Sequence, residues 1–85
     1  MAEIRNEQHR TGLVMRLKRI EGQLRGIQAM IEAGEDCEKI VQQISASRRA
    51  LDKAFFNVLA CAVQDEGSAP ERRVRNAAEL LAKFG

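Results

Sequence analysis

Aromatic residues are scarce in this sequence, which has no tryptophan, no tyrosine and three phenylalanines among its 85 residues. The phenylalanines fall at positions that we expect to lie in the core. The chain therefore has no aromatic platforms on which unpaired bases could stack, and single-stranded nucleic-acid binding of that kind is not expected. There is one proline, and no segment alternates apolar and polar residues as a strand would, so the sequence predicts an all-α fold.

Side chains that commonly carry out catalysis are also few. His9 is the single histidine, and it lies near the N-terminus. The sequence contains no Ser/His/Asp set, no phosphate-binding loop and no close Cys-x-x-Cys pair. Because no catalytic constellation is visible, we do not expect an enzyme.

An apolar run of membrane length is missing, and residues 1–7 are too polar for a signal peptide. We therefore expect a cytoplasmic protein with no membrane partner. In that reducing compartment both cysteines, Cys37 and Cys61, should be free thiols. At 1.5 Å rise per residue along one helix they would lie roughly 36 Å apart, too far for a disulfide within one chain. If they act together, they do so across a subunit interface.

The apolar residues of the first half recur at helical spacing and predict an amphipathic helix over about 6–33. Gly34 suits the left-handed position after a helix, and Asp36 suits the N-cap of a second helix over about 36–64. Pro70 can open a short third helix over about 70–84, which must dock on the other two to be stable. The first stripe is formed by Leu13, Leu17, Ile20, Leu24, Ile27 and Ile31, and the third by Val74, Ala77, Ala78, Leu81 and Phe84.

The second expected helix has an apolar stripe that Arg48 interrupts, at a position that should face a partner. Ser47, Ala50 and Ala54 are small enough for close helix packing, and Gly22 and Gly26 suggest that another backbone approaches the first helix. One antiparallel hairpin cannot cover both of its long stripes, so a four-helix bundle of two hairpins is the smallest sensible oligomer. The second stripe is formed by Cys37, Val41, Ile44, Leu51, Phe55, Val58 and Ala62.

The net charge of +2 conceals basic clusters that could contact phosphates. We expect the first cluster to lie on the face of its helix away from Leu13, Leu17 and Ile20. Such clusters are also typical of ordinary solvated helix faces. The candidates are Arg16, Lys18 and Arg19 in the first helix and Arg48, Arg49 and Lys53 in the second.

Two blocks of sequence resemble the copper-, nickel- and formaldehyde-responsive transcriptional repressors of the CsoR/RcnR/FrmR family. The first block is RLKRIEGQLRGI over residues 16–27, and the second is Cys37 followed by QQISASRRAL over residues 42–51. The resemblance runs without gaps from about Leu13 to Glu66. It implies an all-helical homotetramer, built as a dimer of dimers, that binds double-stranded operator DNA and is released when an inducer reaches Cys37. It also implies that Arg16, Arg19 and Arg49 lie in the DNA-binding stretches.

The chain departs from the family at its metal site. Metal-sensing members carry a histidine and then a cysteine or histidine further along the second helix, at positions that are Ala62 and Glu66 here. Both positions return to within about 20° of the face of Cys37. Ala62 cannot bind a metal ion, and Glu66 is a hard oxygen donor that suits Cu(I) poorly. The sequence therefore favours thiol chemistry over metal coordination.

We accordingly expect a repressor whose inducer, a persulfide or an electrophile such as formaldehyde, reacts at the sensor thiol Cys37, with Cys61 of a neighbouring subunit as a possible partner. No cofactor is required in this interpretation. The first alternative is a metal-sensing repressor in which Cys37, Glu66 and His9 bind a transition-metal ion such as Ni(II), Co(II) or Zn(II). The second is a helical assembly module without a role on DNA.

Overall fold

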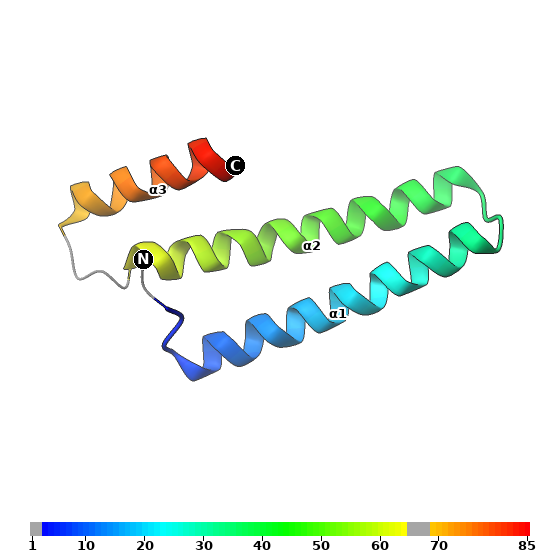
Figure 1. Ribbon diagram of the computed structural model, residues 1–85, viewed down its shortest axis with the longest axis horizontal. Helices are drawn as coiled ribbons and strands as arrows, with labels where there is room; N and C mark the ends of the chain where they lie inside the picture. Colours follow the sequence, from blue (N-terminus) through cyan, green and yellow to red (C-terminus); the bar gives the residue numbers. More distant parts are fainter. Residues whose placement is uncertain (1–2, 65–68) are drawn as a thin grey trace.

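A computed structural model describes residues 3–64 and 69–85. The chain forms three helices, α1 (Glu7–Glu32), α2 (Cys37–Gln64) and α3 (Pro70–Phe84), and α1 and α2 make a long antiparallel hairpin (Figure 1). The described residues contain no strand. The prediction of an all-α protomer with a long hairpin and a short C-terminal helix is therefore confirmed. None of the helices in the described ranges is both long and apolar enough to cross a membrane.

The turn between α1 and α2 is closed by backbone hydrogen bonds around Gly34. Gly34 has a φ of 73°, the left-handed conformation that glycine adopts without steric cost. Its N–H donates to the carbonyl of Ile31 at 3.1 Å, and the N–H of Glu35 donates to the carbonyl of Met30 at 2.9 Å. These two bonds are the pattern of a Schellman motif, which satisfies carbonyls that the end of a helix leaves free.

The other helix ends follow the chemistry of their sequences. The Asn6 side chain accepts a hydrogen bond from the His9 N–H at 3.0 Å and so caps α1. The Asp36 carbonyl accepts from the Ile40 N–H at 3.2 Å, which places Asp36 at the start of α2. Pro70 occupies the first turn of α3, where its missing N–H removes no helical hydrogen bond.

Small residues of α2 pack against a seam of larger residues on α1. Leu13, Ile20 and Ile27 are buried, and each is one heptad from the next. Opposite them lie Ser47 and Ala54, which are 3% and 6% exposed. The prediction that small residues of the second helix allow close helix packing is therefore confirmed for Ser47 and Ala54.

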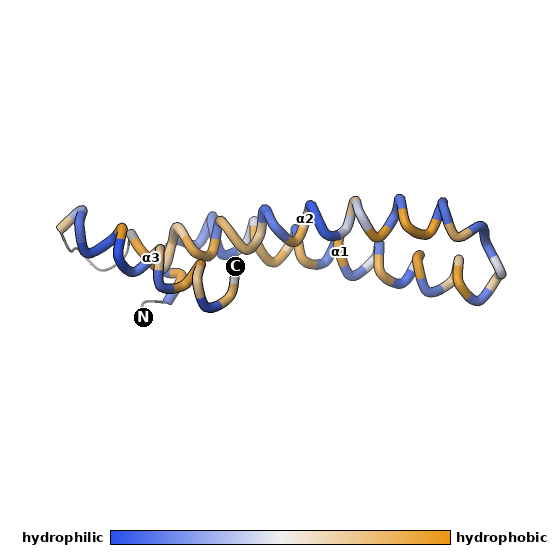
Figure 2. Tube along the Cα trace, turned by 90° about the horizontal axis from the view of Figure 1, so that it is seen from above, coloured by the Kyte–Doolittle hydropathy of each residue, from blue (hydrophilic) through white to orange (hydrophobic). Residues whose placement is uncertain are grey.

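The remaining apolar residues of both long helices are exposed in the protomer. The chain measures 53 × 28 × 13 Å, so it is a single layer about one helix thick. Figure 2 shows apolar segments recurring along the whole length of α1 and α2. A single layer cannot enclose a core, so this surface is available to a partner. Its large exposed side chains on α1 and α2 include Leu17, Leu24, Ile31, Val41, Ile44, Leu51 and Val58.

Helix α3 docks on α2 alone, on the side away from α1 (Figure 1). The prediction that it would pack on both helices is therefore wrong, and so is the predicted contact face. Val74 and Phe84 are 70% and 64% exposed, whereas the half-buried residues of α3 include Arg73, Ala77 and Leu80. A helix that packs against one neighbour buries only a narrow strip of its surface. Turning the helix about its axis by the angle between successive residues therefore changes which side chains are covered.

Candidate sensor and nucleic-acid-binding sites

Cys37 is the first residue of α2, and its thiol is exposed and not in a disulfide. The turn at Gly34 and the carbonyl of Asp36 fix its position at the N-terminal end of the helix. The geometry makes Cys37 accessible to reagents in the protomer.

Cys61 lies near the opposite end of the hairpin and is half-buried. Its Sγ is 3.4 Å from Nδ1 of His9, within hydrogen-bond reach for sulfur. His9 is positioned by the Asn6 cap, which holds the first turn of α1 beside the last turns of α2. We did not predict this contact, because the sequence analysis considered His9 only as a metal ligand together with Cys37 and Glu66. The contact could have been predicted from the antiparallel hairpin, because that arrangement brings the start of α1 beside the end of α2.

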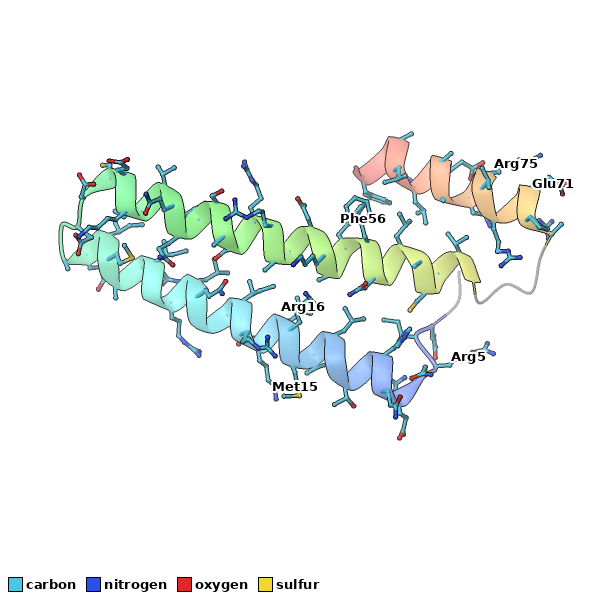
Figure 3. All side chains as sticks on the ribbon, turned by 180° about the vertical axis from the view of Figure 1, so that it is seen from behind. Arg5, Met15, Arg16, Phe56, Glu71 and Arg75 are labelled. Atoms are coloured by element: carbon cyan, nitrogen blue, oxygen red, sulfur yellow. The ribbon has the colours of Figure 1, made fainter. Side chains whose placement is uncertain are left out.

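A cleft between α1 and α2 surrounds the His9–Cys61 pair. It has a volume of about 300 Å³, and its lining includes Gly12 and Ala60, whose lack of bulk leaves the space open. Arg16 also lines this cleft and is half-buried. Figure 3 shows Arg16 on the side of α1 that faces α2. The prediction that Arg16 lies on the face away from the apolar stripe is therefore wrong. It lies four residues before the buried Ile20, about 40° from it around the helix.

His9 and Cys37, the two described residues of the alternative metal site, do not come together in the protomer. His9 contacts Cys61, which follows Cys37 on the same helix by roughly 36 Å. Glu66 lies outside the described residues, and Ala62 supplies no ligand. Within the ranges described, no three His, Cys, Asp or Glu side chains are grouped so that they could hold a metal ion.

The other candidate phosphate contacts are exposed and lie at one level of the hairpin, that is, at similar positions along its long axis. The contacts of Gln23 with Ser47 and of His9 with Cys61 define an antiparallel register, and in it Arg19 lies level with Leu51. Arg49 Nη1 donates to Ser45 Oγ at 3.3 Å, which steadies its side chain on the surface. The exposed basic residues at this level are Lys18, Arg19, Arg48, Arg49 and Lys53.

The family description that matches the chain is "Metal-sensitive transcriptional repressor", and the match covers residues 9–84. The chain belongs to this family. Membership confirms the resemblance found in the two sequence blocks, and it agrees with the expectation that the protein is a regulator and not an enzyme. No solved structure gives a significant match.

Two curated relatives of this chain are named as copper sensors. The chain is 50% identical over 44 residues to the copper-sensing transcriptional repressor CsoR of Bacillus subtilis, a match over 52% of the chain and 44% of the relative. It is 42% identical over 52 residues to the copper-sensing transcriptional repressor RicR of Mycobacterium tuberculosis, a match over 61% of the chain and 54% of the relative. The chain thus spans about half the length of these two relatives.

A third relative of the chain is matched over more of its length. It is an uncharacterized protein from the bioA 5′ region of Serratia marcescens, 30% identical over an alignment of 73 positions that covers 81% of the chain and 80% of the relative. The name of this relative specifies no inducer. The sensor role of Cys37 and the DNA contacts therefore remain predictions.

Proposed function

We propose that this chain is a transcriptional repressor that binds double-stranded operator DNA as a homo-oligomer and is released by an inducer acting at Cys37. The observation that carries the DNA role is the set of exposed basic side chains at one level of the hairpin, in a chain that belongs to a repressor family. Basic groups at one level can follow a single stretch of phosphate backbone. Repeating the hairpin by symmetry would extend that surface.

The oligomer is a dimer of dimers. It is supported by the apolar residues of α1 and α2 that the protomer leaves exposed, since a second hairpin laid against this layer gives a four-helix bundle. The sensor role of Cys37 is supported by its exposed position at the end of the hairpin, one helical turn from exposed Val41 on the surface that the partner would cover. A modified Cys37 would therefore alter the packing between subunits and the spacing of the basic surfaces on DNA.

The preferred inducer is a thiol-reactive molecule, such as a persulfide donor or formaldehyde. Ala62 supports this choice, because it occupies a position where metal-sensing members place a ligand. The names of the copper-sensing relatives favour the alternative, in which Cys37, Glu66 and His9 of different subunits hold a metal ion in the cytoplasm. The last alternative, an assembly module with no role on DNA, is tested by the same experiment as the main proposal.

The DNA role is tested by binding to a pool of promoter fragments over a series of salt concentrations. Arg19→Ala should weaken binding and reduce the slope of log affinity against log salt by about 1, because one phosphate contact is lost. Arg75→Ala, which removes an exposed charge from α3, is the matched control. If the wild type binds none of the fragments, or if both variants behave alike, the assembly module becomes the better interpretation.

The inducer is tested by titrating the reduced protein with Cu(I), Ni(II), polysulfide and formaldehyde while DNA release and protein mass are recorded together. We expect release that accompanies a covalent mass increase and disappears in Cys37→Ser. A tight stoichiometric metal complex that releases DNA without a covalent change would overturn the thiol proposal in favour of metal sensing.

A further inference from the structure

The His9–Cys61 pair has the arrangement of a thiol with its own proton acceptor. The imidazole Nδ1 lies 3.4 Å from the sulfur, and the two residues belong to different helices that the buried seam of Leu13 and Ala54 holds together. A nucleophile and a base within hydrogen-bond reach are the defining geometry of an activated nucleophile. As the neutral tautomer with its proton on Nε2, His9 can accept the thiol proton at Nδ1.

The surroundings of Cys61 are suited to a small reagent. The sulfur is half-buried at a cleft of about 300 Å³, whose lining includes the polar side chains of Gln8, Asn57 and Arg16. A side chain could be added at Gly12 without meeting any atom within 4 Å, so the approach along α1 is open. Cys37, by contrast, is exposed at the far end of α2 and has no histidine near it, because the single histidine contacts Cys61.

We propose that His9 and Cys61 form a second modification site within one protomer, at which a small soft carbon electrophile alkylates Cys61 with His9 as the base. In the reaction with an alkyl halide, the sulfur–carbon bond forms as the carbon–halogen bond breaks. The halide leaves with the bonding electrons, and the thiol proton passes to His9 Nδ1 and then to solvent. This site does not depend on Cys37, on a second subunit or on DNA binding, so it goes beyond the proposed function.

The test uses the two thiols of the same full-length, reduced protein as reference and target. Limiting iodoacetamide is added, and the alkylation rates of Cys61 and Cys37 are measured separately by mass spectrometry of their peptides. His9→Ala should slow the reaction of Cys61 by about tenfold or more, since base catalysis of this kind is usually larger still. The rate at Cys37 should stay within about twofold, because it lies roughly 36 Å along the helix.

Two controls separate proton transfer from a loss of structure. Adding imidazole to His9→Ala should restore part of the Cys61 rate, which a merely structural role of His9 would not allow. Thr11→Ala removes an exposed side chain near His9 on α1 that does not line the cleft, and it should leave the rate unchanged. The proposal is overturned if Cys61 in the wild type reacts no faster than in His9→Ala, if imidazole gives no rescue, or if Thr11→Ala has the same effect as His9→Ala. Loss of DNA binding would change none of these readouts.

Discussion

The Ser47 hydroxyl donates a hydrogen bond of 3.1 Å to Oε1 of Gln23, across the seam between α2 and α1. Ser47 is the most deeply buried polar residue of this seam, at 3% exposure, and its hydroxyl has a partner as buried polar groups require. The bond also fixes the register of the hairpin, because it joins one position on each helix. Both the small size of Ser47 and its hydrogen bond therefore help to define how the helices meet.

Enlarging this position should destabilise the hairpin. Ser47→Leu forces a larger side chain between α1 and α2 and removes the donor to Gln23, at a cost of about 2 kcal/mol in the free energy of unfolding. Thermal unfolding followed by circular dichroism at fixed protein concentration measures the effect. Gln42→Leu, an exposed position on the same helix, is the control and should shift the midpoint little. Equal midpoints for the two variants would show that the seam is not closely packed.

Two glycines with different backbone conformations should have opposite effects on stability when each is replaced by alanine. Gly34→Ala places a Cβ at a φ of 73° and should cost about 1 kcal/mol. Gly12→Ala lies inside α1 with no atom within 4 Å of the new Cβ, and it should stabilise the protein by about 0.5 to 1 kcal/mol. Chemical denaturation of both variants beside the wild type measures the two shifts. A stabilising Gly34→Ala would contradict the turn described here.

A charge on the exposed apolar surface should dissociate the oligomer. Ile44 is 47% exposed in the protomer and belongs to the stripe that a second hairpin would cover. Ile44→Glu would bury an unpaired carboxylate in that interface, so we expect a smaller species by light scattering after size exclusion, with helical content retained. Met15→Glu, at a position 56% exposed and off the stripe, is the matched control and should leave the mass unchanged (Figure 3).

Much of the architecture could be predicted from the sequence because it depends on local chemistry. The left-handed Gly34, the turn before α2 and the proline that opens α3 each act within a few residues, and the structure has them where the sequence placed them. The single heptad stripe of α1 was less informative. It divides into the residues that face α2, among them Ile20, and the exposed residues such as Leu24 that alternate with them. Hydrophobic periodicity cannot distinguish these two uses of one stripe.

The contacts that define the candidate sites depend on how distant segments meet, which the sequence did not specify. The His9–Cys61 pair and the cleft position of Arg16 both follow from the register of α1 against α2. A shift of one helical turn would separate the histidine from the thiol. The docking face of α3 was missed for a similar reason, since an amphipathic pattern indicates a face to within about one residue position but not the strip that a single neighbour covers.

Arg48 should weaken assembly in the wild type, so removing its charge should strengthen the dimer. By helical geometry Arg48 lies within the exposed apolar stripe, between Ile44 and Leu51. A second hairpin on this stripe would desolvate the guanidinium, and burying a charge without a partner is unfavourable, so an apolar side chain of similar volume should pack better there. Arg48→Leu should therefore lower the dimer dissociation constant by about tenfold, measured by sedimentation equilibrium.

The comparison with Arg49 makes this last prediction specific to the stripe. Arg49 is also exposed but lies about 100° further round α2, where its guanidinium bonds to Ser45. Arg49→Leu removes the same charge and should leave the dissociation constant unchanged, whereas it should weaken DNA binding if Arg49 contacts a phosphate. A weaker dimer in Arg48→Leu would mean that the partner supplies a carboxylate to Arg48, because breaking a buried ion pair costs more than the pair contributes. An equal tightening in both variants would instead point to general charge repulsion between subunits, and the stripe would then not be the interface.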